Sequence, residues 1–144
     1  MKLARKKSAN FPNCQFLHGS GELLRALPER SFDGMILSNI LDNLRPEEAE
    51  MVLSEATRLL RVGGRLWIKL NDHLSEEQIA QDSIRRVEGD LLEDGLLLWN
   101  RETEKWETDL RARFETAAYQ SLYLPDYEQY NRMFFCEKPI KGRQ

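Results

Sequence analysis

A helical stretch between two short apolar runs constrains the fold of this chain more than any other feature. Pro46 suits the first position of a helix, and Glu47 and Glu48 suit the positive end of its dipole. Apolar residues then recur at helical spacing up to Leu60, and Gly63-Gly64 is predicted to end the helix because glycine tolerates the left-handed conformation. The pattern predicts an amphipathic helix that buries one face.

The apolar runs around this helix are typical of strands. Gly34-Met35-Ile36-Leu37 is continuously apolar, as in a parallel strand covered on both faces, and we expect it at the centre of a sheet. Leu66-Trp67-Ile68-Lys69-Leu70 follows the helix directly. A strand, a helix and a strand joined by short loops predict a crossover with parallel strands. An earlier run, Cys14-Gln15-Phe16-Leu17-His18, predicts one more strand.

Beyond residue 70 the expected elements are shorter. Ser75 and Gln78 have the spacing of a capping box and predict a helix to about Asp82. Residues 86–100 predict two strands around a Glu93-Asp94-Gly95 turn, and a helix over 103–118 and a strand over 132–137 follow. Three residues are predicted to be core: Trp67, Trp99 and Trp106. The whole chain is predicted to be one α/β domain, with a mostly parallel sheet and antiparallel end strands.

Composition narrows the class of protein. The 144 residues include 21 Lys and Arg against 24 Asp and Glu, and this net charge of −3 lacks the basic excess of a dedicated nucleic-acid binder. No apolar run approaches the roughly 18 residues that cross a bilayer, and the N-terminus lacks a signal peptide's apolar segment. Cys14 and Cys136 lie far apart, so we expect free thiols and no metal site. These features predict a cytoplasmic protein without a membrane partner.

Several short motifs, taken in order, resemble a known family. They are Gly19-Ser20-Gly21-Glu22, Leu27-Pro28, Ser31-Phe32-Asp33, Leu37-Ser38-Asn39-Ile40-Leu41 and Leu59-Leu60-Arg61-Val62-Gly63-Gly64-Arg65-Leu66. In this order and spacing the chain resembles the class I S-adenosylmethionine-dependent methyltransferases over about residues 3–138. The resemblance implies a Rossmann-like sheet and transfer of a methyl group from S-adenosylmethionine to an acceptor. We favour a small-molecule acceptor, which the sequence does not identify.

Part of the family's cofactor site has no counterpart among these residues. The resemblance implies a glycine-rich loop after the first strand and an acidic ribose-binding residue after the second, yet the 144 residues contain no GxGxG motif. The first seven residues are similar to the helix that follows the acidic residue. We therefore expect an N-terminally truncated domain with weak cofactor binding. The exposed edge of the 34–37 strand then predicts a homodimer, or repacking of the first segment against that edge.

The resemblance also points to residues that contact the cofactor. Ser20 and Gly21 stand where the family's Asp-Ala dipeptide contacts the adenine, although an ordinary turn or a helix cap is the simpler explanation for Ser20. Ser38, Asn39 and Ile40 follow the 34–37 strand, at the sheet edge where open α/β sheets bind ligands. A strand-ending turn is the alternative explanation for Asn39.

Two side chains near that edge are candidates for a catalytic base. Asp42 could accept a proton from an oxygen or nitrogen acceptor, with a surface carboxylate as the alternative. His73 follows the 66–70 strand, where an imidazole would suit a proton acceptor, although a loop histidine is often simply exposed. Four tyrosines either wall a substrate pocket or pack over the sheet: Tyr119, Tyr123, Tyr127 and Tyr130.

Two functions of different classes follow from these features. The first is a methyltransferase-family domain with the substrate-side half of the fold, which mainly aligns the reactants. The second is a non-catalytic, truncated methyltransferase-like module that oligomerises through the exposed sheet edge. Saturable micromolar binding of S-adenosylmethionine would exclude the module.

Overall fold

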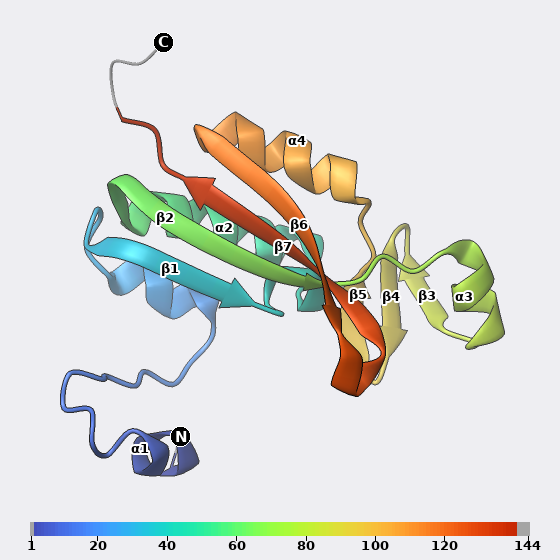
Figure 1. Cartoon of the computed structure of the whole chain (residues 1–144), viewed down its shortest axis with the longest axis horizontal. Coiled ribbons are helices and arrows are strands. Elements are labelled where there is room, and N and C mark those ends of the chain that lie inside the picture. The colour runs from blue at the N-terminus through green and yellow to red at the C-terminus, as the bar shows by residue number, and fades with distance from the viewer. Residues whose placement is uncertain (1, 141–144) are drawn as a thin grey trace.

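The computed structural model describes residues 2–140, and Figure 1 shows a main sheet, a smaller sheet and the helices around them. The main sheet has the strand order β1-β2-β7-β6, and the smaller sheet has the order β3-β4-β5. The α-helices are α1 (Lys2–Lys7), α2 (Pro46–Leu59), α3 (Glu76–Gln81) and α4 (Thr103–Arg113). The strands are β1 (Phe32–Ser38), β2 (Leu60–Asn71), β3 (Arg85–Glu88), β4 (Leu91–Asp94), β5 (Leu96–Trp99), β6 (Thr116–Leu124) and β7 (Gln129–Glu137). Short 3₁₀ helices lie at η1 (Gly21–Ala26), η2 (Leu41–Asn43) and η3 (Pro125–Tyr127).

The predicted crossover is confirmed. Strand β1 runs parallel to β2, with Leu37 opposite Ile68, and α2 connects them. The apolar stripe of α2 is buried from Ala49 to Leu59, as its helical spacing predicts. Strand β7 is antiparallel to both β2 and β6. The mixed α/β class is therefore confirmed, with a smaller parallel share than expected.

Side chains on β2 alternate between a covered and an uncovered face of the main sheet. Leu66 and Ile68 are fully buried and share one core with Phe134 and with the apolar sides of α2 and α4. Trp67 points to the other face and is 46% exposed, so its predicted core position is wrong. Its ring meets that of Phe135 edge-on, with 6.0 Å between the centroids. Helices α2 and α4 thus cover one face of the main sheet (Figure 1). Apolar side chains remain exposed on the other face.

Strand β1 lies at the edge of the main sheet, and not at its centre as predicted. Its hydrogen-bonded neighbour among residues 2–140 is β2, and Ile36 is 66% exposed. The predicted strand at 14–18 is also wrong, because this segment is irregular and mostly exposed. A strand needs a partner for its backbone N–H and C=O groups, and the described chain places none beside this segment. The first segment does not repack against β1.

The Gly63-Gly64 pair bends a strand and does not end the helix. Helix α2 stops at Leu59, and β2 continues through both glycines. Gly63 has a φ of 72°, and a side chain on Gly64 would come within 2.8 Å of the backbone oxygen of Arg61. Both positions therefore favour glycine for reasons that concern the strand.

The C-terminal end of α2 is capped by a residue far along the chain. The Lys138 ammonium donates to the carbonyl oxygens of Thr57 and Leu60, each at 2.7 Å. Cations near the last carbonyls of a helix are favourable because these carbonyls form the negative end of the dipole. Helix α2 has 14 residues, and the described chain contains no helix with the length and apolarity needed to cross a membrane.

The second long helix is shorter than predicted. Helix α4 buries Trp106 and Leu110 as expected but ends at Arg113. Ala118 lies in β6, opposite Phe135 of β7, so its predicted helical position is wrong. Most residues of β6 are exposed, which removes the alternation that marks a half-buried strand.

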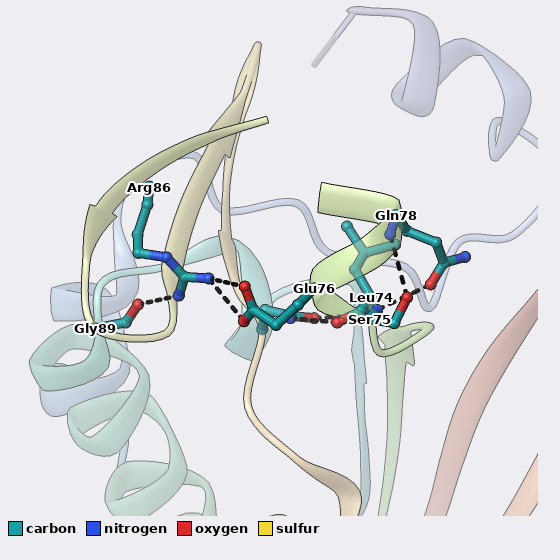
Figure 2. Close-up of polar contacts among 7 residues, drawn as sticks. Leu74, Ser75, Glu76, Gln78, Arg86 and Gly89 are labelled. Carbon is teal, nitrogen blue, oxygen red and sulfur yellow. Dashed lines mark hydrogen bonds and ion pairs between the residues drawn. The ribbon is translucent and has the colours of Figure 1, made fainter. Parts of the chain in front are cut away.

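Residues 75–99 form a unit of one helix and one small sheet. The Ser75 hydroxyl accepts from the Gln78 amide at 3.2 Å, and the Gln78 side chain accepts from the Ser75 amide at 2.9 Å, which confirms the capping box (Figure 2). Arg86 donates to both carboxylate oxygens of Glu76 at 2.8 Å and to the carbonyl of Gly89 at 2.6 Å. These bonds tie α3 to β3, a strand that the sequence did not predict as a separate element.

Candidate functional site

A cavity of about 500 Å³ lies where β2 ends. Its walls come from η2 at Asn43, from the end of β2 at Asn71, from residues 94–98 of the β4–β5 hairpin, and from residues 128–130 before and within β7. Figure 1 shows the β6–β7 hairpin and the small sheet at this end of the main sheet. Open α/β sheets bind ligands beyond the carboxyl ends of their parallel strands, and β1 and β2 both end on this side. We therefore take this cavity as the candidate binding site.

Asn71 forms the centre of the polar groups beside the cavity. Its backbone amide and its side-chain amide both donate to one carboxylate oxygen of Asp42, at 2.7 and 3.0 Å. Its backbone carbonyl accepts from Nε of Arg132 at 2.8 Å. Asn43 is held by a bond of 2.8 Å from its side-chain amide to the carbonyl of Leu97 on β5. These bonds fix two amide side chains of the cavity wall.

Asp42 and Arg132 are buried charges that are linked through Asn71. Burial raises the pKa of the Asp42 carboxyl, and the hydrogen bonds from Asn71 and the charge of Arg132 oppose this rise. Burial lowers the pKa of the Arg132 guanidinium, and the Asp42 charge opposes this fall. The guanidinium also donates to the carbonyl of Arg101 at 2.7 Å. Each charge offsets part of the desolvation of the other.

Several atoms of this buried cluster have no hydrogen-bond partner. They are Oδ1 of Asp42, Nη2 of Arg132 and both side-chain polar atoms of Asn131. Asn131 lies opposite Asn71 in the β2–β7 register and next to Tyr130, and both of these neighbours line the cavity. Buried polar atoms without partners are rare in folded proteins, so this cluster marks a place where a further polar partner is expected.

The residues expected to contact a cofactor lie in two places. Ser20 caps η1, where its hydroxyl accepts from the Glu22 amide at 3.4 Å, and it is exposed. Gly21 packs on α2 so closely that a side chain would come within 2.8 Å of Val52. The turn and cap interpretation of Ser20 thus describes its local role, and an adenine contact remains a prediction.

The second group follows β1. Ser38 ends the strand and is exposed, and Ile40 is 37% exposed. Asn39 has a φ of 52°, and its amide donates to the carbonyl of Lys69 on β2 at 2.9 Å. Asparagine tolerates the left-handed conformation better than most residues, so Asn39 is indeed the strand-ending turn residue. Its contact with a cofactor remains a prediction.

The two candidate bases differ in their surroundings. Asp42 is fully buried, so its interpretation as a surface carboxylate is wrong, and it adjoins the cavity through Asn71. His73 is half-buried, and its backbone amide donates to the Asp72 carboxylate at 2.9 Å. Neither side chain lines the cavity, and a catalytic role for either one remains a prediction. Of the four clustered tyrosines, the cavity wall includes Tyr130.

Sequence reasoning did not find Asn71 or Arg132 as site residues. The signal for Asn71 was available, because Asn71-Asp72 follows an apolar strand in the same way that Ser38-Asn39 follows another. Arg132 had no such signal, since it begins an apolar run and arginine is normally exposed. Its burial depends on carbonyls at 71 and 101, which only the folded chain brings together.

Known proteins resemble this chain in sequence. A family model described as a methyltransferase domain matches residues 1–68. The arsenite methyltransferase of Aquipseudomonas alcaligenes is 40% identical over 95 residues, which cover 62% of this chain and 26% of that protein. The chain therefore spans about a quarter of the curated relative that it matches.

Solved structures share the fold. The 1,6-didemethyltoxoflavin-N1-methyltransferase of Burkholderia thailandensis, with 1,6-didemethyltoxoflavin and S-adenosylhomocysteine bound, has a TM-score of 0.74 at 18% identity, over 95% of this chain and 56% of that chain. The N-methyltransferase NodS of Bradyrhizobium japonicum, in complex with S-adenosylhomocysteine, has a TM-score of 0.66 at 11% identity, over 96% and 61%. At these identities the comparison shows the fold alone.

Proposed function

We propose that this chain is a member of the class I S-adenosylmethionine-dependent methyltransferases, which it resembles in sequence and fold, and that it forms the acceptor-binding part of a cytosolic methyl-transfer site. The single observation that carries this proposal is the cavity at the end of β2. Its volume of about 500 Å³ lies within the usual range of small-molecule pockets, which supports a small-molecule acceptor. The methyltransferase match over residues 1–68 supports S-adenosylmethionine as the donor.

The residues present fit one side of such a donor. Ser20 is exposed and its hydroxyl makes a long local bond of 3.4 Å, so it is available to the adenine amino group. We propose that Ser20 and Gly21 contact the adenine, and that Ser38, Asn39 and Ile40 lie near the transferred methyl group. The 144 residues contain no GxGxG loop, so we propose that this chain alone binds the donor weakly.

For methyl transfer, the main task of this chain would be to align the acceptor with the methyl group. Bound S-adenosylmethionine would supply a methyl group activated by a positively charged sulfur. The fixed amides of Asn43 and Asn71 would orient the acceptor in the cavity, and the hairpins at 94–98 and 128–130 would exclude water from it. No covalent intermediate with the protein is needed.

Titration of the isotope-labelled chain with S-adenosylhomocysteine tests the proposed donor site. At millimolar ligand we expect changes in the amide resonances of Ser20, Gly21 and Asn39, without saturation at micromolar ligand. Unchanged resonances at these residues would refute donor binding. Saturation at micromolar ligand would refute the proposed weakness. Adenosine serves as a control, because it shares the adenine contacts and lacks the sulfur end.

A specific observation favours the second function, a module that associates through β1. One edge of β1 has no hydrogen-bonded neighbour within residues 2–140, and Ile36 and Trp67 expose apolar surface beside a hollow of about 380 Å³. Unprotected sheet edges pair readily with another chain, and we propose a second copy as that partner. Sedimentation velocity over a range of concentrations tests this. A single monomeric species at every concentration would contradict it.

A further inference from the structure

We propose that the cavity at the end of β2 selects ligands that combine an apolar body with a positively charged group, as a small amine does. The inference deepens the proposed function, because it names the class of methyl acceptor that this cavity would take: an amine that binds as its ammonium form and releases a proton to solvent before its nitrogen attacks the methyl group. The preference itself depends on the cavity alone, so it is testable in the absence of any methyl donor.

The side chains with charge in the cavity wall are acidic. Asp72, Asp94 and Glu128 belong to its wall, whereas no lysine or arginine does. All three carboxylates are exposed, so each contributes a modest attraction that salt weakens. Together they favour a cation and disfavour a carboxylate or phosphate on the ligand.

The buried guanidinium beside the cavity does not reverse this field. Arg132 donates a hydrogen bond to the backbone carbonyl of Asn71, and Asp42 accepts one from the Asn71 amide, so both charges belong to one network. The interaction between these two opposite charges offsets each of them. Arg132 also interacts with Asp72 of the wall, so the net negative charge of the cavity wall comes chiefly from Asp94 and Glu128.

The remaining wall adds apolar surface. Leu96, Leu97 and Leu98 of β5 line the cavity, and Leu96 is 72% exposed. Large exposed leucines are favourable against an apolar ligand surface, since each buried Å² of such surface stabilises by about 25 cal/mol. A ligand with an apolar body and a cationic end would thus satisfy both parts of the wall.

An independent observation indicates that this place takes a polar partner. Asn131 is 1% exposed, and neither polar atom of its side chain has a hydrogen-bond partner. It lies between two wall residues, opposite Asn71 in the strand register and next to Tyr130 in the chain. Such atoms are normally satisfied by a protein group, an ordered water or a bound ligand, and Asn131 adjoins the cavity without lining it.

Three probes of similar shape and different charge test the proposal on the whole chain. Tyramine is a cation, 4-ethylphenol is neutral, and 3-(4-hydroxyphenyl)propionate is an anion. We expect tyramine to shift the amide resonances of Asn43, Gln78 and Leu97 at the lowest concentration and the anion to shift them least. Added salt should reduce the preference. Equal or tighter binding of the anion, or no shift with any probe, would overturn the proposal.

Isosteric variants locate the preference. Asp94→Asn and Glu128→Gln should each weaken tyramine binding by about two- to fivefold, the range of exposed ion pairs, and leave 4-ethylphenol unchanged. Glu88→Gln is the matched control, because Glu88 is exposed on β3 and outside the cavity wall. Unchanged tyramine binding in both cavity variants would refute the proposal. If tyramine is preferred while S-adenosylhomocysteine fails to bind, only the donor proposal is refuted. If S-adenosylhomocysteine binds while tyramine is not preferred, only the cation preference is refuted.

Discussion

The two faces of the main sheet differ more than any other two regions of the molecule. On one face, Leu66 and Ile68 are fully buried under α2 and α4. On the other face, Trp67 of the same strand β2 is 46% exposed, and Ile36 of the neighbouring edge strand β1 is 66% exposed. Strand β2 thus contributes buried side chains to the core on one face and an exposed apolar side chain on the other. The contrast teaches that the described chain packs its core on one side of the sheet and leaves apolar surface exposed on the other.

Thiol reactivity should give the largest contrast between covered and uncovered regions. Cys136 belongs to the core, where burial raises the pKa of its thiol to about 12, and Cys14 is exposed in the irregular first segment. We expect N-ethylmaleimide to modify Cys136 more slowly than Cys14 by a factor on the order of a thousand or more, because Cys136 reacts through unfolding. Mass spectrometry of timed samples measures both rates. Comparable rates would contradict the buried position.

Truncation of neighbouring residues on β2 should separate the two faces in stability. Leu66→Ala removes a fully buried side chain and should lower the free energy of unfolding by about 2–5 kcal/mol. Trp67→Ala removes a larger side chain and should cost less, because much of that side chain is already in water. Urea denaturation of both variants gives the order, and the reverse order would break the comparison.

The buried carboxyl of Asp42 should make stability depend on pH. Its pKa is raised in the folded state above the ordinary 3.8, so over the interval above 3.8 the folded chain binds more protons than the unfolded chain. Stability from this group therefore falls as pH rises through that interval. As pH rises above 3.8 through this interval, Asp42→Asn should gain stability relative to the unmodified chain. Asp72→Asn is the exposed control, and a relative loss in Asp42→Asn would contradict the shift.

The smallest effect on stability is expected on the uncovered face. Ile36→Lys should change the free energy of unfolding of the monomer by less than about 0.5 kcal/mol, because Ile36 is 66% exposed. The same change should abolish self-association through β1, since edge lysines block strand pairing. Sedimentation velocity checks this against Leu17→Lys, which adds the same charge to the exposed first segment. Association that survives Ile36→Lys would exclude the β1 edge.

Local patterns in the sequence predicted the elements that depend on local physics. The stripe of α2 and the Ser75 cap of α3 could be found because helix faces and caps involve residues three or four apart. The wrong predictions concern which strands lie next to one another in the sheet. The segment at 14–18 is apolar like a strand, and the run at 34–37 is apolar like a central strand, but apolar side chains do not reveal which backbone will lie alongside.

The candidate site likewise contains residues that the sequence could predict and residues that it could not. The Ser38-Asn39 end of β1 was predictable, because polar residues directly follow an apolar run. The burial of Asp42 was not, since it depends on amide donors at Asn71, 29 positions away. The cavity itself depends on walls from η2, β2, the small sheet and the β6–β7 hairpin. No short sequence motif marks such a site, because its wall residues lie far apart in the chain.

The bonds from Lys138 to the end of α2 connect the order of synthesis to the order of folding. A ribosome releases β1, α2 and β2 before it has made the ammonium group that caps the helix, which lies 81 positions beyond Thr57. Until Lys138 is synthesised, the carbonyls of Thr57 and Leu60 at the end of α2 therefore lack this donor and face water. Nascent chains that stop short of this lysine should be conspicuously easy for proteases to cut near Thr57.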